Sequence, residues 1–342
     1  KDSPNEAIQI KVANAMFNQG ITYGQQGKPD DELNSYAALI EQFKDSPNEA
    51  IQIKVANAMF NQGITYGQQG KPDDELNSYA ALIELFKDSS NEAIQIKVAN
   101  AMFNQCITYG QQGKPDDELN SYAALIEQFK DSPNEAIQIK VANAMFNQGI
   151  TYGQQGKPDD ELNSYAALIE QFKNSPNEAI QIKVAKAMSN QGIIYGRQKD
   201  FTTALNLHSQ LLELFKDTNN AEIKEQVKTA QANIAELALF FETPEQVCIR
   251  IAEVENTNEN TQVLSVMTFI RFLLNDKTIN DVLTAIAVIP KETELTWQFD
   301  EIKEYLAANF TGEKQQQTQA VVAFFEQHKN IETLRNALGI QR

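Results

Sequence analysis

The apolar positions of residues 1–43 follow two helical patterns in succession. Between residues 7 and 24 the apolar side chains cover about two-thirds of a helical circumference, which predicts an inner helix packed on three sides. Between residues 29 and 43 they form a single face, which predicts an outer helix covered on one side. Gly27 and Pro29 stand between the two segments and are suited to end one helix and begin the next. The segment is therefore predicted to fold as a helical hairpin.

This 43-residue unit recurs along the chain. Three further copies are almost unchanged and a fourth has diverged, at residues 44–86, 87–129, 130–172 and 173–215. The near-identical copies depart from the first only at Leu85, Ser90 and Cys106. Repetition of one supersecondary unit at such a period is typical of a solenoid, in which each unit buries its apolar face against its neighbours. The sequence predicts an all-α fold, a right-handed superhelix of helical hairpins with an inner and an outer layer.

The helix starts within each unit carry cap signals. In the first unit we expect Ser3 to cap the inner helix, Pro4 to be its first residue and Glu6 to complete a capping box. The outer helix begins with an acidic run at residues 30–32, where the positive end of the helix dipole favours negative charge. We interpret this run as a solvated helix start and not as a metal or acid–base cluster.

The period is lost after residue 215. A sixth inner helix is predicted at 218–241, and further helices are predicted at 243–255, 261–275, 278–289, 294–309 and 313–338. We expect five repeats (1–215), a diverged sixth repeat (216–257) and a C-terminal helical cap (258–342) that covers the apolar face of the last repeat. Trp297, the sole tryptophan, is expected in the core of this cap.

The spacing of large and small residues within the unit resembles that of a known family. The positions concerned are Met16, Gly20, Tyr23, Gly27, Tyr36 and Leu39. They resemble the tetratricopeptide repeat, in a longer bacterial variant because the period is 43 residues and not 34. Glu32 and Leu39 depart from the family, which usually has alanines there. The resemblance implies a protein-interaction scaffold without catalytic activity.

Composition and charge narrow the classes of partner. The net charge of −17 argues against nucleic acid, because that binding draws on lysines and arginines that contact phosphates. No apolar run reaches the length of a membrane span. The two cysteines, Cys106 and Cys248, show neither disulfide-framework nor zinc-site spacing, which fits a reducing, cytoplasmic location. The chain starts at Lys1 at the edge of a repeat, and we expect it to be a piece of a longer protein.

Catalytic and metal-binding motifs are not found in the sequence. The two histidines, His208 and His328, belong to no metalloprotease or nucleophile motif. His208 occupies the position of Tyr36 within its repeat, so we expect a core histidine. The sequence therefore indicates a protein that is not an enzyme, with no catalytic residues, no metal site and no cofactor.

The candidate binding surface is a polar stripe on the inner helices. In repeats one to four it comprises a lysine and two asparagines at helical spacing: Lys11, Asn14, Asn18, Lys54, Asn57, Asn61, Lys97, Asn100, Asn104, Lys140, Asn143 and Asn147. Asparagine can donate and accept hydrogen bonds at once, which suits an extended peptide backbone. The resemblance supports such a use for Asn18 and its equivalents. The stripe predicts a concave groove for an acidic or polar peptide of a partner protein, and the alternative is a merely solvated helix edge.

The fifth repeat makes this stripe more cationic. Its positions are Lys183, Lys186, Asn190 and Arg197, with Ile194 as an apolar contact. Such a set is suited to a carboxylate or an acidic residue.

Two other functions remain open. The array is also compatible with the regulatory or sensor arm of a larger enzyme that lies upstream. Residues 3–25 keep the apolar flanks of an internal repeat without a preceding unit, which predicts an alternative structural role, in which chains associate end to end through the uncapped N-terminal repeat.

Overall fold

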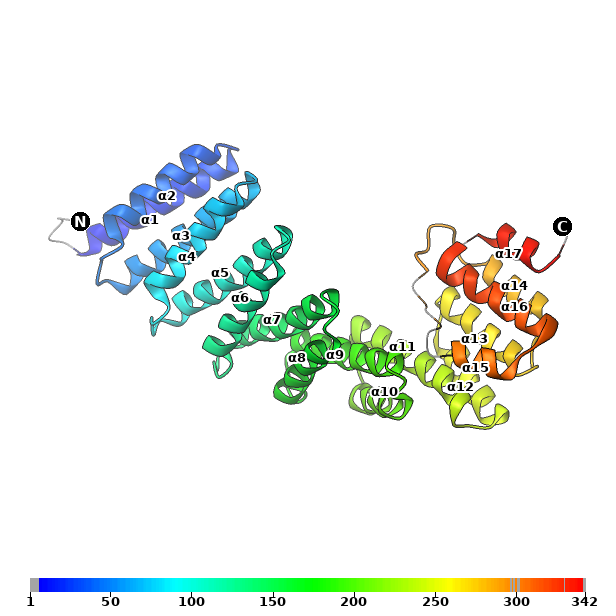
Figure 1. The fold of residues 1–342 in the computed structure, drawn as a ribbon. Helices are drawn as coiled ribbons and strands as arrows, with labels where there is room; N and C mark the ends of the chain where they lie inside the picture. The colour runs from blue at the N-terminus through cyan, green and yellow to red at the C-terminus, as the bar shows by residue number, and fades with distance from the viewer. Residues whose placement is uncertain (1–5, 296, 298, 300–301, 329, 341–342) are drawn as a thin grey trace. The chain divides into compact units, whose positions relative to one another are not determined.

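The computed structural model describes residues 6–295, 297, 299, 302–328 and 330–340. Every regular element in this described part is a helix (Figure 1). The chain divides into two compact units, unit 1 at residues 1–180 and unit 2 at residues 181–342. The predicted all-α fold is confirmed.

Unit 1 consists of four helical hairpins in sequence (Figure 1). Their helices are α1 (Glu6–Gln25), α2 (Pro29–Phe43), α3 (Glu49–Gln68), α4 (Pro72–Phe86), α5 (Glu92–Gln111), α6 (Pro115–Phe129), α7 (Glu135–Gln154) and α8 (Pro158–Phe172). Each odd-numbered helix packs against the even-numbered helix that follows it, and α1, α3, α5 and α7 pack against one another in order. The odd-numbered helices therefore form a continuous inner layer, and the stacked hairpins form the predicted superhelical solenoid.

The turn inside each hairpin has the geometry that its sequence predicts. Gly27 has a φ of +68°, a left-handed conformation that glycine adopts without steric cost. The backbone N–H of Lys28 then donates to the carbonyl of Tyr23, which closes the end of α1. Pro29 is the first residue of α2. The predicted end of α1 and both ends of α2 are confirmed.

The predicted cap of the inner helices is wrong where it can be checked. Ser3 and Pro4 lie outside the described residues. In the second unit Asn48, and not Ser46, caps α3, because its Oδ1 accepts from the N–H of Ile51 at 3.0 Å. Ser46 instead accepts from the N–H of Asn48, so the serine shapes the loop that leads to the cap.

The glutamate expected in the capping box links neighbouring units instead. The carboxylate of Glu49 accepts from the side-chain amide of Asn91, the cap of the next inner helix, at 2.6 Å. The same pairing joins Glu6 to Asn48, Glu92 to Asn134 and Glu135 to Asn177. A single Asn-Glu dipeptide therefore starts one helix and fixes its spacing to the next.

In the first, second and fourth hairpins of unit 1 a glycine of the inner helix lies under a tyrosine ring of the outer helix. A Cβ added at Gly20 would overlap the ring of Tyr36, which is fully buried. Cys106 occupies this glycine position in the third unit, and its Sγ donates to the carbonyl of Met102 at 3.1 Å. The ring of Tyr122 there lies 6.3 Å from that of Phe103, compared with 5.6–5.8 Å for the equivalent pairs of the other units. The cysteine side chain is accommodated by a displaced ring.

Unit 2 continues the hairpins and then changes to irregular helix packing. Its helices are α9 (Glu178–Arg197, which begins within unit 1), α10 (Phe201–Phe215), α11 (Ala221–Leu237), α12 (Pro244–Thr257), α13 (Thr261–Leu273), α14 (Ile279–Ala287), α15 (Lys303–Asn309), α16 (Gly312–Ala323) and α17 (Ile331–Ala337). A 3₁₀ turn at Ala238–Phe240 follows α11, and a π-helical turn at Phe324–His328 follows α16.

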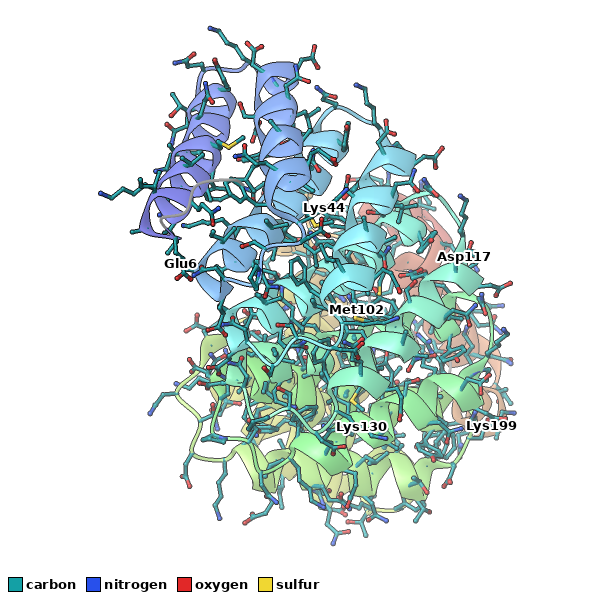
Figure 2. The ribbon with its side chains drawn as sticks, turned by 90° about the vertical axis from the view of Figure 1, so that its left-hand side faces the viewer. Glu6, Lys44, Met102, Asp117, Lys130 and Lys199 are labelled. Atoms are coloured by element: carbon teal, nitrogen blue, oxygen red, sulfur yellow. The ribbon has the colours of Figure 1, made fainter. Side chains whose placement is uncertain are left out.

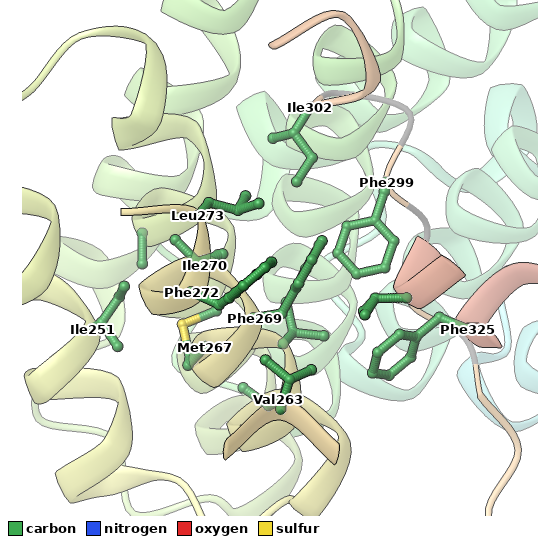
Figure 3. Close-up of a cluster of buried hydrophobic side chains, with 14 of the residues drawn as sticks. Ile251, Val263, Met267, Phe269, Ile270, Phe272, Leu273, Phe299, Ile302 and Phe325 are labelled. Atoms are coloured by element: carbon green, nitrogen blue, oxygen red, sulfur yellow. The ribbon is translucent and has the colours of Figure 1, made fainter. Parts of the chain in front are cut away.

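The C-terminal helices form a common core with α11. Phe269, Phe299 and Phe325 meet edge to face in its centre, with ring centroids 5.5 and 5.6 Å apart (Figure 3). Ala232 and Ala235 of α11 belong to the same buried cluster. The helices after α11 therefore cover its apolar face.

Two predicted helices of this region are wrong. The helix expected at 294–309 is limited to α15, and the described residues before it include Leu295 and Phe299, which are buried in non-helical backbone. The helix expected at 313–338 is divided into α16, the π turn and α17. The wider π turn allows two consecutive residues, Phe324 and Phe325, to be buried together, and Asn330 caps the new helix.

Candidate functional site

The lysines of the polar stripe lie on aromatic rings of the preceding inner helix. The ammonium Nζ atoms of Lys54, Lys97 and Lys140 lie 5.2, 5.0 and 5.1 Å from the ring centroids of Phe17, Phe60 and Phe103. This is the distance range of a cation–π interaction. All three lysines are half-buried, and burial lowers the pKa of Lys97 and of Lys140. The stripe is therefore a lysine–phenylalanine ladder that crosses from helix to helix.

These three lysines have no ion-pair partner within the described part of the chain. The lysines after the outer helices do form ion pairs. The Nζ atoms of Lys44, Lys87 and Lys130 each lie 3.0 Å from a carboxylate oxygen of the glutamate three residues earlier. Figure 2 labels Lys44 and Lys130 of this outer set. The lysines after the outer helices, Lys173 included, are thus neutralised by a glutamate of the preceding helix, and the three ladder lysines are not.

The first asparagines of the stripe lie one helical turn beyond the ladder lysines. Asn57, Asn100 and Asn143 are half-buried, and their side chains make no hydrogen bond within the described residues. Their amide groups are therefore able to bond to a peptide backbone.

The second asparagines are engaged between repeats. Asn61 donates its side-chain N–H to the hydroxyl of Tyr36 at 3.1 Å, and Asn104 donates to that of Tyr79 at 3.0 Å. Asn147 bonds to Tyr122 in the same way. Burial of the tyrosines raises their pKa, to about 12 for Tyr79. The donor groups of these asparagines serve packing, and their role in ligand binding stays a prediction.

The acidic run at the start of each outer helix was expected to be solvated, and for its third residue this expectation is wrong. Asp30 and Asp31 are exposed, but Glu32 lies over Gly24, where an added Cβ would overlap its carboxylate. The equivalent Glu75 is half-buried and bonds to the hydroxyls of Thr108 and Tyr79. Burial raises the pKa of Glu75 in spite of these bonds. The burial of this glutamate could not be predicted from its position at a helix start. It depends on the missing side chain of a glycine in the preceding helix, which leaves room for the carboxylate.

The cationic set of the fifth repeat is partly neutralised. Lys186 forms an ion pair with Glu222 of the next inner helix at 2.9 Å. Burial, and next the charge of Lys186, lower the pKa of Lys183. Ile194 is 7% exposed, so the predicted apolar contact with a ligand is wrong. Arg197 is exposed at the end of α9, and Asn190 is half-buried.

The first repeat differs from the others in the exposure of its polar stripe and of its apolar flank. Lys11 and Asn18 are exposed and Asn14 is half-buried. Ile8 and Val12 are 50% and 37% exposed, whereas the equivalent Ile51 and Val55 are fully buried. The apolar front of α1 is thus open in this structure.

The remaining candidate groups are buried or lie apart. His208 is 1% exposed in the tyrosine position of its repeat, as predicted, and burial lowers its pKa to about 4. The side chain of His328 lies outside the described residues. Within the described part, no three histidine, cysteine, aspartate or glutamate side chains are grouped to hold a metal ion. Among the described helices, none combines the length and apolar character needed to cross a bilayer.

Comparison with known proteins agrees with this repeat architecture. Three segments match the tetratricopeptide repeat family, at residues 14–46, 57–89 and 143–175. Each begins at the first asparagine of the polar stripe and ends beyond the outer helix. No curated protein matches the sequence.

Several solved structures have a similar arrangement of helices. A tetratricopeptide repeat protein from Parabacteroides merdae is 14% identical, with a TM-score of 0.40, over 81% of this chain and 91% of its own. The apo form of RapI is 16% identical, with a TM-score of 0.44, over 77% and 93%. The apo form of the quorum sensor NprR from B. thuringiensis is 13% identical, with a TM-score of 0.47, over 96% and 87%.

Two observations agree: helical hairpins in which a glycine lies under an aromatic ring, and three segments that match the repeat family. The chain is a tetratricopeptide-like repeat protein.

Proposed function

We propose that this protein is a protein–protein interaction scaffold whose inner-helix layer in unit 1 holds an extended, acidic segment of a partner protein. The observation that supports the proposal is the ladder of Lys54, Lys97 and Lys140, each backed by a phenylalanine and without an internal ion-pair partner in the described part of the chain. The ladder is a local cationic surface on a protein whose net charge is −17.

The ladder is suited to carboxylates for energetic reasons. A half-buried ammonium has already lost part of its hydration on folding, so a carboxylate that approaches it forms a charge-assisted hydrogen bond at reduced desolvation cost. Such bonds contribute about 1.5–3 kcal/mol each. The phenylalanine rings hold the lysine stems in place, which lowers the entropy lost on binding.

The repeat geometry sets the register of the partner. Packed helices lie about 8–10 Å apart, and an extended strand rises about 3.3 Å per residue. Ladder lysines on adjacent inner helices would therefore meet carboxylates at about every third residue of an extended chain. Asn57, Asn100 and Asn143 would bond to the backbone between them.

The test compares two triple variants of equal charge change. Lys54→Gln/Lys97→Gln/Lys140→Gln removes the ladder, and Lys44→Gln/Lys87→Gln/Lys130→Gln removes the outer lysines that pair with their own helix. Fluorescence anisotropy measures binding of a labelled peptide with a glutamate at every third residue. We expect the ladder variant to bind at least about tenfold more weakly and the outer variant to bind like the wild type. Equal affinities of the two variants would show that net charge, and not the ladder, governs binding.

A further inference from the structure

A group of five aromatic rings in unit 2 is partly exposed to solvent. Phe201 begins α10, Phe240 and Phe241 follow α11, Tyr305 belongs to α15, and Phe310 is the C-cap of α15. The ring centroids are 4.3 Å apart for Phe201 and Phe240, 5.8 Å for Phe240 and Tyr305, and 6.1 Å for Tyr305 and Phe310. The centroid of Phe241 lies 6.4 Å from that of Phe240. These are contact distances for aromatic pairs, so the five rings, which we name the aromatic cluster, are continuous with one another.

The aromatic cluster is an open surface on a fixed base. Phe241 is 53% exposed, and each of the other four rings is partly exposed. Phe240, Tyr305 and Phe310 also pack against the buried core of unit 2. Contiguous exposed apolar surface is typical of a site that contacts another molecule, and a surface that is already held in place loses little entropy when it binds.

The near-identical repeats lack these aromatic residues. At the positions of Phe201 and Phe240 the first repeat has Pro29 and Gln25. The other three rings also come from the sequence after residue 215, where the 43-residue period is lost. The aromatic cluster is therefore a feature of this part of the chain that the stacking of repeats does not require.

Charged side chains next to the cluster have partners within the chain. Glu242, which follows Phe241, accepts from Nε of Arg250 at 2.7 Å. Lys314, whose Nζ lies 5.0 Å from the ring centroid of the C-cap phenylalanine of α15, donates to two backbone carbonyls at the end of α13. Asp200, which precedes α10, accepts from the N–H and the hydroxyl of Thr203. The cluster therefore favours an uncharged ligand, in contrast to the ladder.

The hydroxyl of Tyr305 is the single polar side-chain group of the cluster. It makes no hydrogen bond within the described residues, and burial raises its pKa, so the hydroxyl is protonated near pH 7 and can donate. A helix or a strand uses its own backbone carbonyls within its secondary structure. A polyproline II segment has no internal hydrogen bonds, and its prolines have no N–H, so its backbone mainly requires donors. Tyr305 offers such a donor in the middle of an apolar surface.

We propose that the aromatic cluster binds an uncharged, proline-rich segment of a partner protein in the polyproline II conformation. Its proline rings pack on the aromatic rings, and one of its backbone carbonyls accepts from the hydroxyl of Tyr305. Aromatic surfaces recognise such segments because the polyproline II helix is formed before binding and little entropy is lost. This inference goes beyond the acidic partner of the ladder and does not depend on it.

Fluorescence anisotropy with the full chain tests this proposal. The probe is a labelled, C-terminally amidated peptide of repeated Pro-Pro-Ala triplets, and its binding should be saturable. A control peptide in which leucine and glutamine replace the prolines stays uncharged and keeps apolar side chains, but it lacks the preformed conformation and should bind at least about tenfold more weakly. The variant without the three ladder lysines should bind the proline peptide like the wild type. Absence of saturation, equal affinity for the two peptides, or loss of binding in the ladder variant would overturn the proposal.

Two substitutions in the cluster have matched controls outside it. Phe241→Ser removes an exposed ring and should weaken binding of the proline peptide at least about fivefold, whereas Ile249→Ser, which removes an exposed apolar side chain from α12, should not. Tyr305→Phe keeps the ring and removes the donor, and should weaken binding about two- to tenfold, whereas Tyr66→Phe in α3 should have no effect. Far-UV circular dichroism verifies the fold of each variant. Wild-type affinity in either cluster variant, or an equal loss in its control, would refute the site.

Discussion

The contact between neighbouring repeats leads to a prediction for Tyr79→Phe. The hydroxyl of Tyr79 accepts from Asn104 of the next inner helix and bonds to Glu75 of its own helix, while the residue as a whole is 1% exposed. The substitution keeps the ring, and with it the contacts to Gly63 and Phe60. It removes a single oxygen atom at a junction between two repeats.

The expected loss of stability follows from the two groups that lose a hydrogen-bond partner when this oxygen is removed. Without the hydroxyl, the amide of Asn104 loses its acceptor and the half-buried carboxylate of Glu75 loses one of its donors. Leaving such groups without partners costs about 1–3 kcal/mol. Because repeat arrays derive their cooperativity from interfaces between neighbours, the loss should fall on the coupling of the second and third repeats.

Urea denaturation followed by far-UV circular dichroism measures the effect, and amide hydrogen exchange in α4 and α5 locates it. Tyr66→Phe is the matched control, because the hydroxyl of Tyr66 makes no hydrogen bond within the described residues and its removal should change stability by less than about 0.5 kcal/mol. If the two variants lost the same stability, the hydroxyl network would not hold the repeats together.

Four further outcomes are expected. Glu75→Gln should stabilise the protein more at neutral pH than at about pH 4. Burial raises the folded-state pKa of Glu75. The contribution of this carboxyl group to stability is therefore present below its unfolded-state pKa and is lost as the pH rises through its folded-state pKa. Thermal melts across pH check this, and a gain that is independent of pH would contradict it. Lys314→Met should lower the free energy of unfolding by about 1–3 kcal/mol in denaturant titrations, because the Lys314 ammonium donates to the carbonyls of Phe272 and Leu273 at the end of α13. The control Lys277→Met, at an exposed position, should leave the free energy of unfolding unchanged. In a Cys248→Ser background the buried Cys106, whose pKa burial raises, should react with iodoacetamide only on unfolding, and rapid labelling of the folded protein would be inconsistent with its burial. If the open front of α1 mediates self-association, the apparent mass in analytical ultracentrifugation should rise with concentration and Ile8→Gln/Val12→Gln should abolish the rise; a wild type that is monomeric at every concentration would argue against it.

The repeat and its helix boundaries could be predicted from the sequence, because the signals are local. Gly27 and Pro29 act on their own backbone, so the turn follows from the two residues themselves. The capping residue could not be assigned with the same certainty, since Ser46 and Asn48 are both good caps and the loop conformation decides between them.

The surface of the inner helices was predicted only in part. Helical spacing placed the lysines and asparagines on one stripe, but the partner of each lies one repeat earlier, at an offset that the stacking sets. The pairing of Lys54 with Phe17 and of Asn61 with Tyr36 depends on that offset. In the C-terminal region no repetition reinforces the pattern, and the irregular burial of Phe299 and Phe324 was not foreseen.

A charge exchange across the ladder tests the central claim most directly. Lys97→Glu should weaken the binding of a peptide with a glutamate at every third residue, and replacing the middle glutamate of that peptide by lysine should restore binding to the variant while weakening binding to the wild type. Recovery of at least about tenfold for the exchanged pair, near 1.4 kcal/mol, is the result that the account predicts. If the lysine-containing peptide binds the variant no better than the original peptide does, the ladder does not hold an acidic partner.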